Sequence, residues 1–252
     1  MCLILFAYNV HPTYKLIVAA NRDEFYGRET APAHFWEDHT EILAGRDLEK
    51  MGTWMGVTKN GRFAAVTNYR DPNEIIDGKL SRGELVSNYL KGSEKPEDYT
   101  KFMEGNAELY PGYNLLVGSP NELYYFSNIS KRSTKIEQGI HGVSNHLLNT
   151  KWPKVVHGKE NLAEVLARKD DDMIESLFKV LQNNDIAPDE SLPNTGVTLE
   201  LERMLSSIFI KSEGYGTRSS TVVLMNDNET IFNERVYAGE TIKDQQFTIN
   251  LH

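Results

Sequence analysis

Two apolar stretches near the start of the chain, CLILFAY at residues 2–8 and KLIVAANRDE at residues 15–24, decide the fold. Each has the length and the aliphatic character of a β-strand, and His11-Pro12-Thr13 supplies a turn between them. We therefore expect an N-terminal antiparallel hairpin. The apolar residues are continuous rather than alternating, which is typical of strands that are covered on both faces.

The rest of the chain reads as groups of strands separated by groups of helices. A Lys59-Asn60-Gly61 turn joins two of the strands, and Ser81-Arg82-Gly83-Glu84 has the spacing of a helix capping box. Further strands are predicted at 41–45, 53–58, 62–67, 113–118, 123–127, 139–144, 220–225, 230–236 and 246–251, and helices after 81 and at 96–106, 154–166, 171–181 and 198–210. This order predicts one α+β domain over residues 1–252, with two packed sheets and helices outside.

Composition narrows the class of protein. The chain has 252 residues, 40% of them hydrophobic and 25% charged, and none of its apolar stretches approaches the ~20 residues that span a bilayer. A formal net charge of −9 argues against nucleic acid or an anionic membrane as the main partner. The start lacks a secretion signal, and a single cysteine suits a reducing compartment, so we expect a cytoplasmic protein without stable membrane insertion.

Cys2 is the only cysteine, and it follows Met1 directly. Removal of Met1 would leave a residue that carries both a thiol and a free α-amine, which titrates near pH ~8 and can accept the thiol proton. The alternative is a structural role, because cysteine within an apolar strand often serves as a small hydrophobe. The position of Cys2 alone favours the structural role, so evidence for a catalytic role must come from other residues.

The charged end of the second strand, Asn21-Arg22-Asp23-Glu24, is the first such companion. Side chains alternate along a strand, so Arg22 and Glu24 share one face while Asn21 and Asp23 share the other. In the predicted hairpin Arg22 lies close to Cys2, where it would lower the thiol pKa, and an aspartate there would hold the amine. An ion-pair cluster that only secures the loop is an equal alternative.

Two asparagines also end predicted strands. Asn68 follows Thr67, and Asn145 follows Ser144. An asparagine amide can donate a hydrogen bond to a developing oxyanion, although an Asx-turn is the commoner reason for asparagine at a strand end. Later, Arg218 lies in the stretch Gly214–Thr221, which could meet an anion but lacks the Gly-Lys-Ser/Thr of a phosphate loop. The seven histidines show no spacing typical of metal ligands.

Several motifs occur together and in order: Met1-Cys2, Ala19–Phe25, Gly52–Gly56, Thr67–Tyr69, Ser81–Val86, Gly142–Asn145 and Gly214–Arg218. With them the chain resembles the NRDE family, also called the transport and Golgi organisation protein 2 family, over essentially its whole length. The resemblance implies a four-layer αββα sandwich similar to N-terminal-nucleophile hydrolases, and a distant likeness to cholylglycine hydrolases and penicillin V acylases.

The resemblance also implies roles for single residues. Cys2 would be nucleophile and, through its amine, base; Asn68 and Asn145 would match two asparagines that position the substrate and line the oxyanion hole. Those hydrolases space their arginine and aspartate as Arg-x-x-Asp, whereas Arg22 and Asp23 are adjacent here. The residues expected to contact substrate are Asn21, Glu24, Tyr69, His146 and Arg218.

Two hypotheses follow. The first is a cysteine hydrolase that acts on an amide or acyl-thioester and requires no cofactor. The second is a protein that binds haem or an acyl-coenzyme A in the same pocket without turnover, since the resembled family is linked to haem trafficking and to acyl-coenzyme A or lipid homeostasis. In both, the partner is a small molecule.

Overall fold

The computed structural model describes residues 2–168, 172–239 and 241–251, and it contains two antiparallel sheets. The six-stranded sheet runs in the order β10 (Gly139–Val143), β1 (Cys2–Tyr8), β2 (Leu16–Phe25), β11 (Tyr215–Met225), β12 (Glu229–Ala238) and β13 (Thr241–Asn250). The seven-stranded sheet runs in chain order through β3 (Thr30–Phe35), β4 (Ile42–Asp47), β5 (Met55–Thr58), β6 (Phe63–Asn68), β7 (Tyr113–Ser119), β8 (Glu122–Ser127) and β9 (Arg132–Lys135).

Strand β1 lies inside its sheet and is buried on both faces. Ile4 and Phe6 belong to the core between the two sheets, whereas Leu3 and Leu5 belong to the core under the helices. Its pairing with β2 confirms the predicted hairpin, and its continuous apolar sequence follows from the two cores that it serves.

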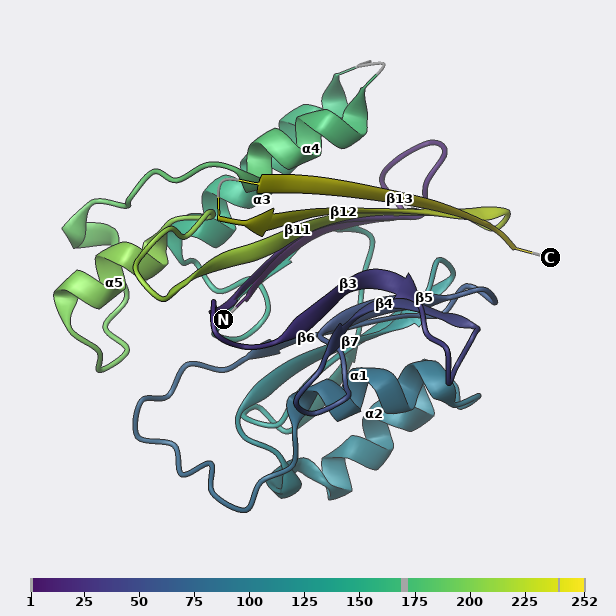
Figure 1. Cartoon of the computed structure of the whole chain (residues 1–252), viewed down its shortest axis with the longest axis horizontal. Coiled ribbons are helices and arrows are strands. Elements are labelled where there is room, and N and C mark those ends of the chain that lie inside the picture. Colours follow the sequence, from purple (N-terminus) through teal and green to yellow (C-terminus); the bar gives the residue numbers. More distant parts are fainter. Residues whose placement is uncertain (1, 169–171, 240, 252) are drawn as a thin grey trace.

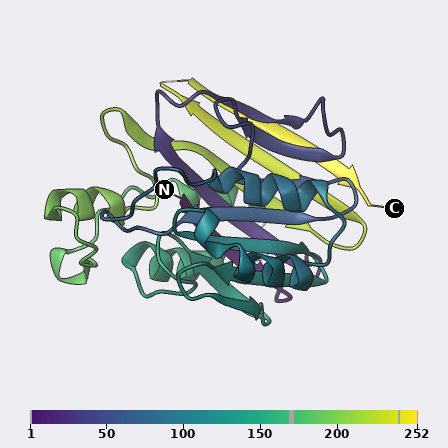
Figure 2. The ribbon, with the colours of Figure 1, turned by 90° about the horizontal axis from the view of Figure 1, so that it is seen from below.

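Helices cover the outer face of each sheet (Figure 1). Helices α3 (Pro153–Ala167) and α4 (Met173–Leu181) lie on the six-stranded sheet, and α1 (Arg82–Lys91) and α2 (Pro96–Gly105) lie on the seven-stranded sheet, as Figure 2 shows from below. Helix α5 (Leu199–Ser206) projects at the left of Figure 1. Short 3-10 turns span Ala107–Leu109 and Asp189–Ser191. The predicted αββα order of layers is confirmed.

Several element boundaries differ from the sequence prediction. The helix predicted at 198–210 ends at Ser206, because residues beyond it use their backbone groups elsewhere: Ile208 O accepts from Asn21, and Ile210 N donates to Thr217. Strands β3 and β9 were not predicted; both are edge strands, the first containing a proline and the second mostly polar. Strands β11 and β13 begin earlier than predicted. The predicted start of α4 at residue 171 lies outside the described residues.

A close approach of two glycines fixes the beginning of α1 against the seven-stranded sheet. A Cβ added to Gly52 would lie 2.6 Å from the carbonyl carbon of Gly83 and 2.8 Å from its oxygen, both backbone atoms that cannot rotate away. Thr53 N donates to the same Gly83 oxygen at 3.3 Å. This contact also sets the position of Arg82, the first residue of the helix.

We therefore expect Gly52→Ala to lower stability by about 1–3 kcal/mol, the usual cost of forcing extra volume into packed structure. For a chain of this size this corresponds to a fall in Tm of roughly 2–10 °C, measurable by calorimetry. Gly27→Ala is the matched control, since a Cβ there meets nothing within 4 Å. An equal Tm for the two variants would contradict the proposed role of the contact.

Candidate functional site

Cys2 begins strand β1, at the end of the chain marked N in Figure 1. Cys2 pairs with Arg22 across β1 and β2, and its side chain is buried, with 8% of the residue exposed. Burial raises the thiol pKa, and the charge on Asp23 raises it further. The charge on Arg22 and a hydrogen bond from the backbone N–H of Asp23 act in the opposite direction. The net effect is a thiol that needs a base before it can react.

Arg22 and Asp23 lie on opposite faces of β2. The alternation that puts Ala20 into the core between the sheets puts Arg22 there too, on the same side as the inward positions of β1. Arg22 is 8% exposed, and its Nη1 has no hydrogen-bond partner among the described residues. A register shift in β11 between Thr217 and Ser219 faces this part of β2.

Asp23 is 1% exposed and points toward the helices. Its Oδ1 accepts a hydrogen bond of 2.7 Å from Thr217 Oγ1. Burial raises the pKa of Asp23, while the positive charge of Lys154, this hydrogen bond and the charge of Arg22 lower it. The carboxylate therefore depends on neighbouring cations to remain ionised at this depth.

A polar link through Ser144 and Asn145 connects Cys2 with the seven-stranded sheet. Ser144 Oγ lies 3.0 Å from Cys2 O and 3.2 Å from Asn145 Oδ1, so its single hydrogen can serve either oxygen. Asn145 Nδ2 donates to Asn68 O at 3.1 Å, and Asn145 O accepts from Arg70 N at 2.8 Å. The two asparagines at the predicted strand ends therefore lie together, joined by the hydrogen bond from the Asn145 side chain to the Asn68 backbone.

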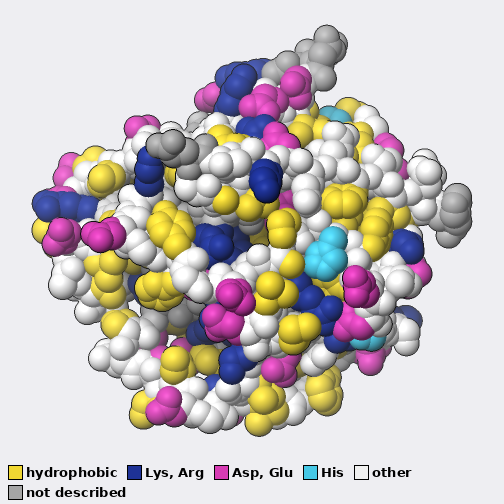
Figure 3. All heavy atoms as spheres, in the orientation of Figure 1, with side chains coloured by type: hydrophobic (Ala, Val, Ile, Leu, Met, Phe, Trp, Pro, Cys, Tyr) yellow, Lys and Arg dark blue, Asp and Glu magenta, His cyan; other side chains and the backbone are white. Residues whose placement is uncertain are grey.

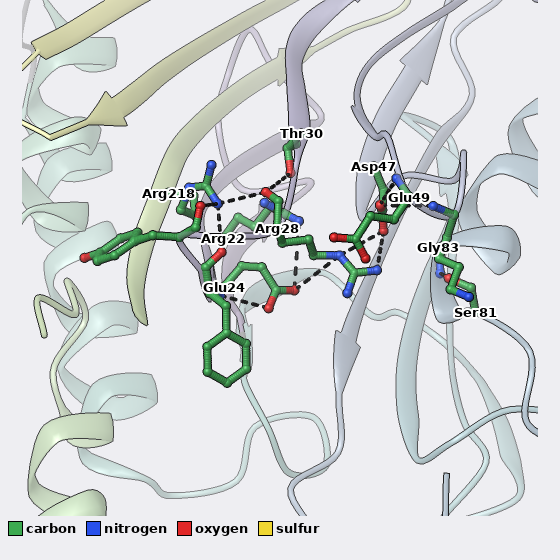
Figure 4. Close-up of polar contacts among 12 residues, drawn as sticks. Arg22, Glu24, Arg28, Thr30, Asp47, Glu49, Ser81, Gly83 and Arg218 are labelled. Atoms are coloured by element: carbon green, nitrogen blue, oxygen red, sulfur yellow. Dashed lines mark hydrogen bonds and ion pairs between the residues drawn. The ribbon is translucent and has the colours of Figure 1, made fainter. Parts of the chain in front are cut away.

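Ionic contacts run from Arg22, the strand partner of Cys2, toward the seven-stranded sheet (Figure 4). Glu24 Oε2 lies 3.9 Å from both Arg22 Nη2 and Arg28 Nε, and Arg28 Nη2 lies 2.6 Å from Asp47 Oδ2. Arg218, expected to meet an anion, donates through Nη1 to the carbonyl oxygens of Phe25, at the end of β2, and of Tyr26 and Arg28 beyond it. These contacts give Arg218 a role in holding that loop.

Three further residues named from the sequence lie around the site rather than beside the thiol. Asn21 faces the helices, and its amide donates to Leu181 O and Ile208 O and accepts from Ser220, which favours a structural role. The rings of Tyr69 and His146 contact each other at a tilt of 39°, with centroids 5.1 Å apart. His146 Nδ1 is also 2.9 Å from Thr150 Oγ1.

Sequence reasoning missed three polar groups close to the thiol. Burial lowers the pKa of Lys154 to about 8, and it lowers the pKa of Arg82, while negative charge at Cys2 raises both. Burial also raises the pKa of Tyr215, with contributions from Asp23 and Cys2. Lys154 stands in the first turn of α3, where a cation opposes the helix dipole, and this unfavourable placement was the available signal.

The described residues favour neither a resident metal nor an open haem ligand. No group of three or more His, Cys, Asp or Glu side chains among residues 2–168, 172–239 and 241–251 could hold a metal ion. Cys2 is enclosed, and the half-buried His146 ring packs against Tyr69 and Trp152. Within the part of the chain that the structure describes, no helix has the length and apolar character needed to cross a membrane.

The molecular surface offers a cleft elsewhere. A cleft of about 410 Å³ lies between the start of α3 and residues 183–191, and its lining includes Lys151, His157 and Ile186 but not Cys2. On the face shown in Figure 3, basic and acidic side chains are interspersed.

Comparison with solved structures identifies the fold. The Caenorhabditis elegans N-acylethanolamine-hydrolyzing acid amidase (NAAA) ortholog superposes with a TM-score of 0.53, over 88% of this chain and 92% of that chain, at 10% sequence identity. The fold is therefore that of the N-terminal-nucleophile hydrolases, as the resemblance implied.

Comparison with sequences identifies the family. The human Transport and Golgi organization protein 2 homolog is 35% identical over 93% of this chain and 92% of its own length, and the Bos taurus homolog is 33% identical over 95% and 94%. The family model described as Transport and Golgi organisation 2 matches residues 1–239. The chain belongs to the Transport and Golgi organisation 2 family.

Proposed function

We propose that this protein is a cysteine hydrolase that acts on an amide or acyl-thioester carbonyl, with Cys2 as nucleophile once Met1 has been removed. The observation that carries the proposal is the convergence of Cys2, Arg22, Asp23 and Asn145 at one end of the sandwich. Arg22 and Asp23 lie on opposite faces of β2, and Asn145 follows β10. A buried cysteine with only a packing role needs none of these three polar residues. The fold supports the proposal without establishing a reaction.

The chemistry starts with the base that the thiol requires. The α-amine of Cys2 accepts the thiol proton, and the sulfur attacks the substrate carbonyl carbon. An S–C bond forms while the C–N or C–S bond of the substrate breaks, and the leaving group takes the proton from the α-ammonium. Water then cleaves the acyl-enzyme thioester, which releases the acid and restores the thiol.

The adjacent Arg22-Asp23 pair can serve this scheme although the two side chains point to opposite faces. A thiol belongs to one face of the strand, but an α-amine belongs to the backbone and can be approached from either side. Arg22 acts on the thiol from the core between the sheets. Asp23 holds the α-ammonium from the side of the helices, where Lys154 keeps the carboxylate ionised.

Charge that develops on the carbonyl oxygen needs a hydrogen-bond donor. Asn145 Nδ2 uses one hydrogen on Asn68 O, which leaves its second hydrogen for the oxyanion and fixes the orientation of the amide. The unpartnered Nη1 of Arg22 is a second donor beside the thiol. Both donors are held before the substrate arrives, which is the condition for effective electrostatic stabilisation.

Burial of the thiol also favours a second candidate function, in which the site binds a ligand without turnover. A thiol with 8% exposure and a raised pKa is also compatible with a site that holds a ligand without turnover. For an acyl-coenzyme A, the guanidinium groups of Arg22 and Arg82 near Cys2 would meet phosphate or thioester oxygens. Haem as cargo has less support, because the Cys2 thiol is buried.

Cys2→Ala separates hydrolysis from binding. Alanine still permits removal of Met1, so the variant keeps a free N-terminus and loses only the sulfur. We expect hydrolysis of a panel of acyl thioesters and amides to fall to background, while Tm stays within a few degrees of the unmodified protein. Intact mass shows whether Met1 is absent. Turnover that survives in Cys2→Ala, or in protein that retains Met1, would rule out the proposed mechanism.

Opposite charges beside the thiol predict opposite effects on its reactivity. Asp23→Asn removes a negative charge and lowers the thiol pKa, so alkylation by iodoacetamide at pH 7.5 should be roughly three- to tenfold faster. Arg22→Gln raises the thiol pKa and should slow alkylation by a similar factor. Hydrolysis should fall in both variants. Asp23→Asn no longer holds the α-amine, and Arg22→Gln no longer lowers the thiol pKa.

The exposed residues Asp77 and Arg132 provide matched controls. Asp77→Asn and Arg132→Gln should leave alkylation and hydrolysis unchanged. If Asp23→Asn instead increased alkylation and hydrolysis together, the assigned role of Asp23 would be wrong.

A further inference from the structure

A small cavity lies next to the site, between the end of β6, the start of α3 and helix α5. Its volume is about 10 Å³, and its polar walls are the side chains of Arg70, Lys154 and Glu202. The remaining wall is largely apolar, with contributions from Trp152, Pro193 and Leu205. The Arg70 guanidinium also lies 4.7 Å from the centre of the Trp152 ring.

Two buried cations turn unsatisfied donors toward this region. Lys154 is 3% exposed, and its Nζ has no hydrogen-bond partner among the described residues. The Arg70 side chain is 6% exposed, and its Nε and Nη2 also lack partners there. Buried charged donors left without partners are strongly destabilising, so a group that satisfies them is expected.

The acceptors around the cavity each hold at least one hydrogen bond. Glu202 Oε2 accepts from Arg70 Nη1 at 2.7 Å, and Oε1 accepts from Thr195 N at 2.9 Å and Thr195 Oγ1 at 2.6 Å. Ser206 Oγ donates to Arg203 O and accepts from Ala187 N. The unmatched groups of the cavity are therefore donors.

The excess of donors distinguishes an anion from water. A water molecule has two hydrogens that would need acceptors, whereas an anion has none. Arg70 and Lys154 also repel each other, since the charge of Arg70 lowers the pKa of Lys154. The first turn of α3 adds its positive dipole end at the same place. The negative charges of Asp23, Cys2 and Glu202 also act on Lys154 and offset part of this positive charge.

The volume limits the ligand to one small sphere. A cavity of this size admits about one water-sized particle, which excludes phosphate, sulfate and carboxylates. We propose that the cavity binds a single chloride ion between Lys154 and Arg70. The ion joins the start of α3 to α5 and to the residues after β6, and its binding does not require turnover at Cys2.

Thermal unfolding in sodium chloride and in sodium gluconate of equal ionic strength tests the proposal. Chloride should raise the Tm of the unmodified protein with a saturable dose, and at ten times Kd the ratio of folded to unfolded protein should rise about elevenfold. Lys154→Met should abolish the difference between the two salts. Lys151→Met, three residues earlier and exposed, should retain it. Equal Tm values in both salts for the unmodified protein would overturn the proposal.

A second measurement does not depend on whether Lys154→Met folds. Crystals of the unmodified protein grown with bromide in place of chloride should give an anomalous peak in this cavity, near Lys154 Nζ and Arg70 Nε. Water at that position without anomalous signal would overturn the proposal.

Discussion

The antiparallel register of β1 and β2 is the constraint on which the site depends. A strand whose two faces serve two different cores cannot slip by one residue, because every side chain would then change face. Cys2 is consequently fixed opposite Arg22, and Asp23 is fixed on the far side. The other site residues are placed around this pair. The pairing of β11 with β2 shifts register beside it, between Thr217 and Ser219.

Buried charge is the second organising feature. Arg22, Asp23, Lys154 and Glu234 are all more than nine-tenths buried, and burial raises the pKa of both carboxyl groups. Glu234 accepts a hydrogen bond from Ala33 N and so joins the two sheets away from the thiol. Such groups persist in an interior only when opposite charges and hydrogen bonds stabilise them together. A protein under selection for stability alone would replace them with apolar residues of similar volume.

Much of this architecture could be predicted from the sequence, because local patterns determine it. The apolar runs of β1 and β2 predicted the hairpin, whereas the strand ends alone favoured turns at Asn68 and Asn145, and only the family resemblance implied a site there. The roles of Arg218 and Asn21 could not be predicted, since their partners are backbone carbonyls that only the tertiary structure brings near. Lys154 and Arg70 are remote from Asp23 in sequence, and no local pattern shows that their charges share one interior.

The long sequence separations within the site have a consequence for how the protein acquires activity. Ser144 Oγ reaches Cys2 O across 142 positions, and Thr217 Oγ1 reaches Asp23 across 194. Closing such loops costs entropy before any contact compensates for it, and sheets rich in distant pairings fold slowly. During synthesis the thiol therefore remains without its companions until almost the whole chain has emerged. The environment of Cys2 is a property of the finished molecule, and an N-terminal fragment that lacks Ser144 and Thr217 lacks these contacts.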